Sequence, residues 1–343
     1  MTRDAIKTLF HPFEAGDVDM PDRHARVLLL GAEPGFVLPA GFEGQLHLVQ
    51  GFRPYYLELE AAGRFPVTPR AEGEGYDAVL VLVGRHRGLN ERNIAEAIER
   101  TRLHGLVLIA GGKEDGIASL RKRLSDLLEL DGHLSKYHSQ ALWFRRSVEA
   151  EAMAVALKVE NPNGLVDGRF LTAPGMFSYN RVDAGSRLLL DNLPDDLSGS
   201  VADFCAGWGY LAAEILARAP EISKHDLYEA DFESLEAAKA NLAGIRPATG
   251  RQFFWHDLVG EPVTERYDAI VMNPPFHKGN AADPAIGQKM IKTAAGALRR
   301  GGRLFMVANR QLPYEVTLNE VFGEHREISR DSGFKVLSGV RRR

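Results

Sequence analysis

The feature that most limits the fold of this chain is an internal repeat. Three apolar segments of the first half, each ending in a glycine-containing loop, return in the second half in the same order. The pairs are "RVLLLGAEPGF" (26–36) with "VADFCAGWGY" (201–210), "YDAVLVLVGRHRG" (76–88) with "YDAIVMNPPFHKG" (267–279), and "HGLVLIAGGKEDG" (104–116) with "GGRLFMVANRQLPY" (301–314). Such self-similarity indicates two copies of one structural unit. We therefore expect an ancient duplication, and a length of 343 residues suits two domains.

Within each copy, apolar stretches alternate with amphipathic helical stretches, which is typical of parallel sheets covered by helices on both faces. Gly, Pro and Asn near residue 160 indicate a boundary, which we place between domains 1–160 and 161–343. In the second domain we expect strands near 200–205, 225–229, 251–255, 267–272, 302–308 and 333–340, and helices near 183–192, 209–218, 231–242, 285–298 and 312–322.

The two copies differ in the residues that could carry chemistry. The first has Gly84, Arg85 and His86 where we align Asn273, Pro274 and Pro275 of the second. We interpret the first copy as degenerate, with a role in scaffolding or in presenting the partner of the second copy.

Composition excludes several classes of protein. Cys205 is the only cysteine, so an intramolecular disulfide is excluded and a reducing compartment fits. The N-terminal residues lack the apolar core of a signal peptide, and no apolar run approaches the roughly 20 residues that span a bilayer. We expect a cytoplasmic protein with no membrane partner and no metal, and a monomer.

The net charge of −4 argues against a generic nucleic-acid binder, so any RNA contact must come from local clusters. Four clusters are candidates, and each is equally consistent with a solvated face or a chain end. They are "GRHRG" (84–88), "RKR" (121–123), "LRRGGR" (298–303) and "RRR" (341–343).

A glycine loop follows the first strand of the second copy. In "VADFCAGWGYLAAEILAR" (201–218), Gly207 and Gly209 let the backbone turn sharply and lie close to a ligand, or serve as a simple turn. The acid Asp203 precedes the turn and suits a ligand with a cationic amine better than a diphosphate. Cys205 and Ala206 lie inside the loop, where their backbone would face the same ligand.

Acidic residues also follow the next two strands. Glu229, followed by Ala230, lies where doubly wound folds place an acid that accepts the hydroxyls of an adenosine ribose. An ordinary helix cap is the alternative, although Asp231 can fill that role. Asp257 can accept from an adenine amino group, and His256 beside it could pack on the ring or be a loop histidine. Together these strand ends fit S-adenosylmethionine.

The corner Asn273, Pro274, Pro275 and Phe276 ends the next apolar run. An exocyclic amine of a nucleobase is a poor nucleophile because its lone pair is delocalised into the ring. The Asn273 amide oxygen and the Pro274 carbonyl can accept the two amine hydrogens and free that lone pair. The prolines keep the corner rigid, and Phe276 offers a face for a planar base swung out of its stack. Carbon methylation of a pyrimidine would need a cysteine nucleophile that attacks the base, and Cys205, the only cysteine, lies in the glycine loop instead.

These residues resemble the ribosomal RNA guanine-N2 methyltransferases. The resemblance rests on "PGMFSYNRVDAGSRLLLDNLP" (174–194), "DFCAGWGYLA", "NPPFHKG", "VANRQLPY" (307–314) and "GFKVL" (333–337). It implies an α/β fold of two tandem class I (Rossmann-like) methyltransferase domains, the first degenerate. It also implies S-adenosylmethionine bound by residues 203–209, Glu229 and Asp257, a guanine amine at 273–276, and a cover over the site. The cover residues are Phe177, Ser178, Arg181 and Asp183, and His277 and Lys278 are further candidate substrate contacts.

The expected reaction is methyl transfer to a guanine N2 amine of small-subunit (16S) rRNA, free or within the small ribosomal subunit. Three alternatives stay open. One is the same transfer to large-subunit rRNA, because "VANRQLPY" also resembles the guanine-N2 methyltransferases of large-subunit rRNA. Another is methylation of a glutamine amide in a protein release factor, and the last is a non-catalytic RNA-binding or assembly factor.

Overall fold

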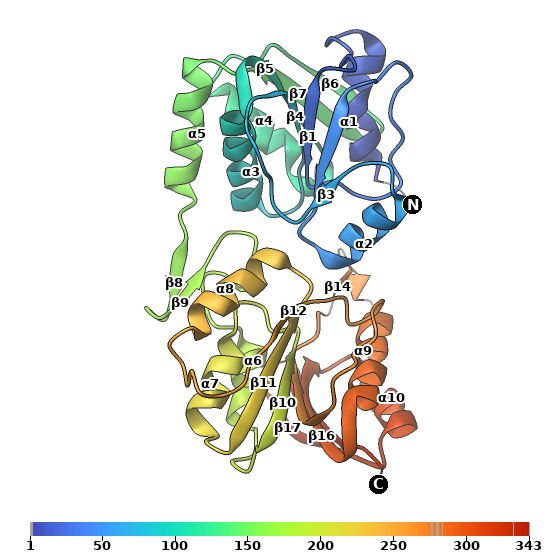
Figure 1. Cartoon of the computed structure of the whole chain (residues 1–343), viewed down its shortest axis with the longest axis vertical. Helices are drawn as coiled ribbons and strands as arrows, with labels where there is room; N and C mark the ends of the chain where they lie inside the picture. The colour runs from blue at the N-terminus through green and yellow to red at the C-terminus, as the bar shows by residue number, and fades with distance from the viewer. Residues whose placement is uncertain (1–2, 276, 279–280, 283, 332, 343) are drawn as a thin grey trace. The chain divides into compact units, whose positions relative to one another are not determined.

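The computed structural model describes residues 3–275, 277–278, 281–282, 284–331 and 333–342. The chain divides into two compact units, Met1–Asn163 and Gly164–Arg343, here called the N-terminal and C-terminal units (Figure 1). The unit boundary therefore lies three residues after the position that the sequence suggested.

The N-terminal unit contains one mixed sheet in the order β3-β2-β1-β4-β5-β7-β6. Its strands are β1 (Arg26–Leu30), β2 (Gln45–Val49), β3 (Val67–Thr68), β4 (Tyr76–Leu82), β5 (Thr101–Gly112), β6 (Gly132–Lys136) and β7 (Ser139–Arg145). Its helices are α1 (Asp4–Ala15), α2 (Arg53–Ala62), α3 (Arg87–Arg100), the short 3-10 turn η1 (Lys113–Asp115), α4 (Ile117–Ser125) and α5 (Val148–Glu160).

The C-terminal unit begins with a small hairpin, β8 (Gly164–Val166) and β9 (Phe170–Thr172), and then builds a sheet in the order β12-β11-β10-β13-β16-β18-β17. Its strands are β10 (Gly199–Phe204), β11 (Ile222–Glu229), β12 (Phe253–Trp255), β13 (Tyr267–Met272), β16 (Leu298–Asn309), β17 (Glu324–Asp331) and β18 (Phe334–Val340), and β14 (His277–Lys278) pairs with β15 (Ala281–Ala282). Its helices are α6 (Ala184–Asp191), α7 (Tyr210–Arg218), α8 (Phe232–Leu242), α9 (Pro284–Ala297) and α10 (Tyr314–Val321).

Both sheets have the same strand order, which is 3-2-1-4-5-7-6 when each copy is numbered separately. The predicted class of two tandem Rossmann-like domains is confirmed. The sheets are not purely parallel, however, because β18 pairs antiparallel with both β16 and β17. The sequence did not reveal β17, since "EHREISRD" is exposed along most of its length and has no alternation of apolar and polar residues.

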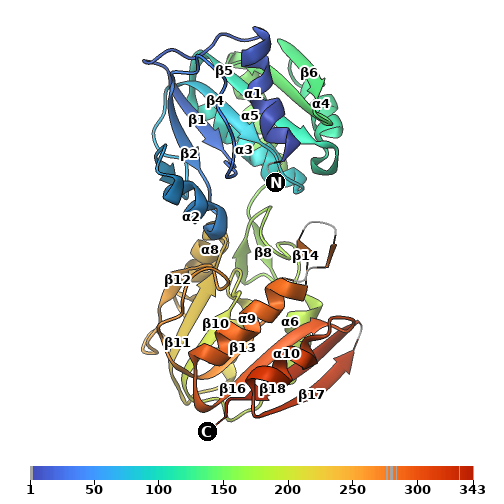
Figure 2. The same cartoon turned by 90° about the vertical axis from the view of Figure 1, so that its right-hand side faces the viewer.

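Helices cover both faces of the C-terminal sheet, as the pattern predicted (Figure 2). On β13, Val271 packs with residues of α6, α7 and α8, whereas its neighbours Ile270 and Met272 pack with residues of α9 and α10. This alternation follows from the pleat of a strand, in which successive side chains point to opposite faces. The two cores fix the strand ends that form the site.

A buried polar bridge also crosses this sheet. The Tyr267 hydroxyl of β13 donates to Asp226 Oδ2 of β11 at 2.8 Å, and the Tyr228 hydroxyl lies 2.7 Å from that of Tyr267. Because the Tyr267 hydroxyl hydrogen is used in the hydrogen bond to the Asp226 carboxylate, the Tyr228 hydroxyl is the donor in the second hydrogen bond. The bridge spans β10, which lies between the two strands.

The sheet registers correct our alignment of the two copies. Val27 pairs with Ala78 in the N-terminal unit, and Val201 pairs with Ala269 in the C-terminal unit. Counting from these pairs, the residue equivalent to Asn273 is Leu82, not Gly84. The N-terminal copy therefore has an apolar side chain where the C-terminal copy has an amide.

Candidate active site

The glycine loop connects β10 to α7 through three residues with left-handed backbone. Their φ angles are 62° at Cys205, 54° at Gly207 and 88° at Gly209. A Cβ at Gly209 would lie 2.5 Å from Leu242 Cδ1, whereas a Cβ at Gly207 would meet nothing within 4 Å. Gly209 thus allows α7 to start against α8, and Gly207 borders open space that a ligand can fill.

Two acids lie beside this loop. Asp203, near the end of β10, is fully buried. Its carboxyl lies near the backbone N–H of Ala212 and has no side-chain hydrogen-bond partner among the described residues. Burial, and then the nearby Glu229, raise the pKa of Asp203 to about 8. Burial also raises the pKa of Glu229 to about 7. A buried carboxyl with no cationic partner among the described residues suits a cationic group.

Glu229 holds the loop in place from the end of β11. Its Oε2 accepts the backbone N–H of Gly207 at 2.8 Å, and its Oε1 accepts that of Asp231 at 2.8 Å. Asp231 itself caps α8 by accepting from the Ser234 N–H. The helix-cap role therefore belongs to Asp231, and Glu229 remains at the loop. Ala230 accepts the Trp255 indole N–H through its carbonyl.

Cys205 shows no sign of being a nucleophile. Burial, and then the charges of Glu229 and Asp203, raise the pKa of its thiol well above the ordinary value, so the thiol stays protonated. Its sulfur lies 3.7 Å from Met290 Sδ. The neighbouring Ala206 is buried and donates its N–H to the Tyr228 carbonyl.

His256 and Asp257 follow β12, the next strand along the sheet. The backbone N–H of His256 donates to the backbone carbonyl of Glu229 at 2.9 Å. The His256 ring meets the Tyr228 ring edge-on, with 5.2 Å between the ring centroids. Asp257 Oδ1 accepts the Val259 N–H at 2.8 Å. The backbone bond places these residues beside Glu229 at the same edge of the sheet.

Asn273 lies directly after β13. Its Nδ2 donates to Asp183 Oδ2 at 3.1 Å and to Ser186 Oγ at 2.7 Å, while its buried Oδ1 has no hydrogen-bond partner among the described residues. Pro274 is buried and Pro275 is exposed. Phe276 lies outside the described residues, as do the side chains of His277 and Lys278, whose backbone forms β14.

The segment from Phe177 to Asp183 is tied to both the loop and the corner. The Phe177 carbonyl accepts the indole N–H of Trp208, a loop residue, at 2.8 Å, and Asp183 meets Asn273 at the other end. Phe177 is 60% exposed as a residue, and Arg181 is also exposed. Ser178 has a left-handed backbone with φ of 52°. The sequence did not predict that Trp208 ties this segment to the glycine loop, since its neighbours in the loop suggest only a turn.

The equivalent place in the N-terminal unit is filled by the chain itself. Arg3 pairs with Glu33 at 2.7 Å and with Asp115 at 2.9 Å, and it donates to the Val83 carbonyl at 3.2 Å. By the sheet registers, Glu33 corresponds to Gly207 and Val83 to Pro274. A guanidinium thus lies where the C-terminal unit leaves room for a cationic ligand.

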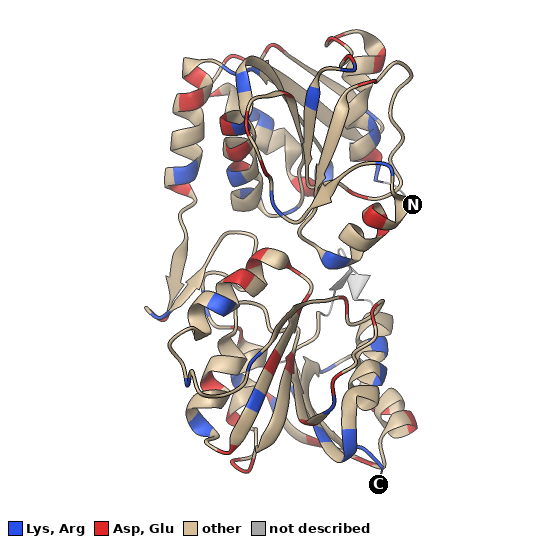
Figure 3. Ribbon diagram, in the orientation of Figure 1, with Lys and Arg blue, Asp and Glu red and all other residues tan. Residues whose placement is uncertain are grey.

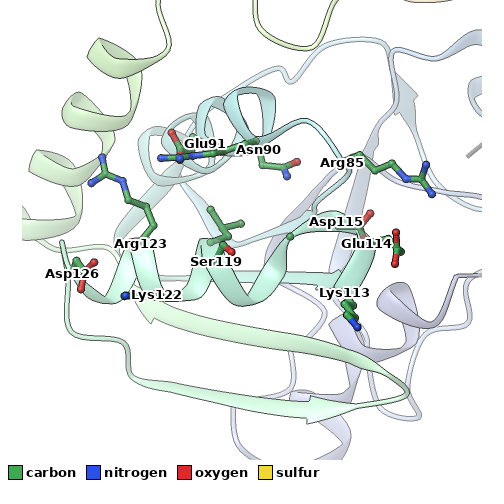
Figure 4. A pocket seen from close by; sticks show the side chains of 13 residues that line it. Arg85, Asn90, Glu91, Lys113, Glu114, Asp115, Ser119, Lys122, Arg123 and Asp126 are labelled. Atoms are coloured by element: carbon green, nitrogen blue, oxygen red, sulfur yellow. The ribbon is translucent and has the colours of Figure 1, made fainter. Parts of the chain in front are cut away.

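The N-terminal unit also contains a pocket of about 640 Å³ between α3 and α4 (Figure 4). Charges of both signs line it, including Lys113, Lys122, Glu114 and Asp126. Acidic and basic residues are likewise interspersed over both units (Figure 3). Within the described residues, no helix is both long and apolar enough to cross a membrane.

Several members of the basic clusters are already engaged within the chain. Arg123 pairs with Glu160, Arg299 with Asp268, and Arg303 with Asp196. These pairs agree with the solvated-face interpretation of the clusters more than with a dedicated nucleic-acid patch.

Comparison with known proteins identifies relatives along most of the chain. A family model, Methyltransferase small domain, matches residues 167–338. The ribosomal RNA small subunit methyltransferase C of Citrobacter koseri is 31% identical over 311 residues, which cover 88% of this chain and 89% of the relative. Its namesake from Shewanella pealeana is 29% identical over 275 residues, 78% of each chain. A solved T. thermophilus 16S rRNA N2 methyltransferase in complex with AdoMet and guanosine has the same fold, with a TM-score of 0.76 and 24% sequence identity. The match covers 98% of this chain and 92% of the T. thermophilus chain.

Proposed function

This chain belongs to the ribosomal RNA small subunit methyltransferase C family within the methyltransferase small-domain proteins, and from that premise we propose that it methylates a guanine N2 amine of 16S rRNA using S-adenosylmethionine. The T. thermophilus relative acts on guanosine 1207 of 16S rRNA, and we propose the equivalent guanine as the target here. The alternative acceptors, large-subunit rRNA and a release-factor glutamine, are not favoured.

The residues at the sheet edge fit the cofactor. Asp203 is a buried carboxyl without a side-chain hydrogen-bond partner among the described residues, which suits the ammonium group of S-adenosylmethionine. Glu229 would hold the ribose hydroxyls, and Asp257 with His256 would hold the adenine. Gly207 leaves room for a ligand beside the backbone of Cys205 and Ala206. When bound, the cofactor supplies an electrophilic methyl group on a sulfonium.

The observation that carries the proposal is the Asn273 amide oxygen, which is buried and lacks a hydrogen-bond partner among the described residues. Accepting one amine hydrogen there, and a second at the Pro274 carbonyl, would draw the guanine nitrogen toward tetrahedral geometry. The same acceptors would stabilise the positive charge that develops on the nitrogen in the transition state. Pro275 keeps this corner rigid.

The exposed residue Phe177 would contact the guanine substrate from the side facing away from the Asn273 corner. Arg181 would lie near the phosphates of the rRNA. We also propose that Phe276, His277 and Lys278 contact the substrate, and that the N-terminal unit is a degenerate copy. The degenerate state of the N-terminal unit is supported by Leu82, which stands there at the position equivalent to Asn273.

Labelled methyl transfer tests the function. Small subunits, large subunits and a release factor, each from a strain lacking this chain, are incubated with the protein and radiolabelled S-adenosylmethionine. We expect label in 16S rRNA, recovered as N2-methylguanosine, from free rRNA or from the subunit. Label confined to large-subunit rRNA or to the release factor would overturn the proposed acceptor, and no label in any arm would favour a non-catalytic role.

A further inference from the structure

The Asn273 side chain can serve as an acceptor only in one of its two amide orientations. If the amide were turned over, its two N–H donors would face the amine hydrogens and repel them. We infer that Asp183 and Ser186 are positioning residues that fix the Asn273 amide with its oxygen toward the acceptor amine. The inference rests on the proposed function and adds what sets the reactive geometry.

The hydrogen bonds allow only one orientation. Asp183 Oδ2 lies 3.1 Å from the Asn273 amide, and an ionised carboxylate can only accept. The nitrogen must therefore face Asp183. Ser186 Oγ accepts from the same nitrogen at 2.7 Å. With both amide hydrogens engaged, Oδ1 is left on the other side, buried and without a partner among the described residues.

The two positioning residues are themselves held rigidly. Asp183 is the N-cap of α6, and the oxygen that meets Asn273 also accepts the Ser186 N–H at 2.8 Å. Ser186 is buried. Gly185 between them is packed closely, since a Cβ there would lie 3.0 Å from Asp183 Oδ2 and 3.2 Å from the Phe334 ring. The start of α6 is thereby a fixed support for the corner after β13.

The carboxylate also affects the strength of the acceptor. A negative charge on the nitrogen side of an amide polarises it and places more negative charge on its oxygen. The oxygen then holds the amine hydrogens more strongly as the amine becomes cationic. Asp183 acts in this way through Asn273, without contact with the substrate.

Two substitutions separate this role from capping. Asp183→Ser keeps an N-capping side chain, but its shorter hydroxyl withdraws from Asn273. Asp183→Asn keeps an oxygen of the same reach and is the matched control. We expect kcat for methyl transfer to fall about 100-fold in Asp183→Ser, the cost of a misplaced transition-state donor or acceptor, with Kd for S-adenosylmethionine nearly unchanged. Asp183→Asn should lose less activity than Asp183→Ser, because it keeps the amide orientation and removes only the polarising charge. Ser186→Ala should lose about tenfold, as for one neutral hydrogen bond.

A double-mutant cycle shows whether Asp183 acts through Asn273. Single-turnover rates are measured for Asp183→Ser in the wild-type background and in an Asn273→Ala background, with circular dichroism to confirm folding. We expect the large loss in the first background and almost no further loss in the second. Equal losses in both backgrounds, or an Asp183→Ser variant as fast as the wild type, would overturn the inference while leaving the proposed function intact. If the proposed function itself fails, the wild type transfers no methyl group to rRNA in the same assay.

Discussion

The Glu229 carboxylate accepts the backbone N–H of Gly207 at 2.8 Å and so joins the end of β11 to the glycine loop after β10. This contact places the proposed ribose acceptor and the loop that borders the cofactor in one rigid unit. Glu229→Ala should weaken binding of S-adenosylmethionine by about 10- to 100-fold, the loss of one or two hydrogen bonds to a charged group. Isothermal titration measures this change, and an unchanged Kd would remove Glu229 from the site.

The affinity for S-adenosylmethionine should depend on pH. The pKa values of Glu229 and Asp203 are raised to about 7 and about 8, and the ligand favours both ionised carboxylates. Lowering the pH from 8 to 6 protonates these groups and should weaken binding by about tenfold or more. Glu229→Gln is the control and should reduce the pH dependence. A Kd that is constant from pH 6 to 8 would contradict the assignment.

The same buried charge should reduce the stability of the unliganded protein at high pH. Because the pKa of Asp203 is raised in the folded state, the folded protein binds more protons than the unfolded chain between about pH 4 and 8. The free energy of unfolding therefore falls as pH rises through this range. Asp203→Asn should stabilise the protein by about 1–3 kcal/mol at pH 8 and weaken cofactor binding. Urea unfolding at pH 6 and pH 8 tests this, and equal effects at both values would contradict it.

The two loop glycines provide a matched pair of substitutions. Both have positive φ, so alanine at either position costs about 1–2 kcal/mol in backbone strain. Gly209→Ala adds a clash with Leu242, whereas Gly207→Ala places a methyl group in open space. We expect Gly209→Ala to lower stability more, and Gly207→Ala to lower cofactor affinity more. The opposite ranking would show that Gly207 does not border the ligand.

Arg3 leads to a prediction about the N-terminal unit. Because its guanidinium already pairs with Glu33 and Asp115, we expect one S-adenosylmethionine per chain in isothermal titration. Arg3→Ala should destabilise the N-terminal unit by about 1–2 kcal/mol, since it leaves the nearly buried Asp115 carboxylate without this partner, and should leave the stoichiometry unchanged. Binding of a second ligand molecule by the wild type would show that the first copy retains its site.

The sequence was sufficient for the fold wherever apolar residues follow a regular period. The strands β10 and β13 and the helices α7 and α8 lie within one residue of their predicted bounds. β17 escaped prediction because its charged residues have no such period, and its place is set by pairing with β18. The alignment of Gly84 with Asn273 was wrong, because it needs a shift of two residues that the strand registers do not contain.

The site was only partly predictable for a similar reason. Strand order brings Asp203, Glu229 and Asn273 to one edge of the sheet, so their grouping follows from the pattern. The direction in which a polar side chain points does not follow from it. Asp183 was predicted only as part of a cover over the site, and its hydrogen bond to Asn273, a residue 90 positions away, could not be read from the pattern. The Arg3 contacts also depend on residues far apart in the sequence.

The central claim is tested most directly by nucleoside analysis of 16S rRNA from cells that lack this chain. Complementation with the wild type should restore one N2-methylguanosine, which fragment mapping should place at the guanine equivalent to guanosine 1207 of the T. thermophilus relative. Asn273→Ala should bind S-adenosylmethionine with similar Kd and restore none, because losing an acceptor costs roughly 100-fold or more in rate. Full restoration by Asn273→Ala, or the same amount of N2-methylguanosine with and without the wild-type chain, would contradict the account.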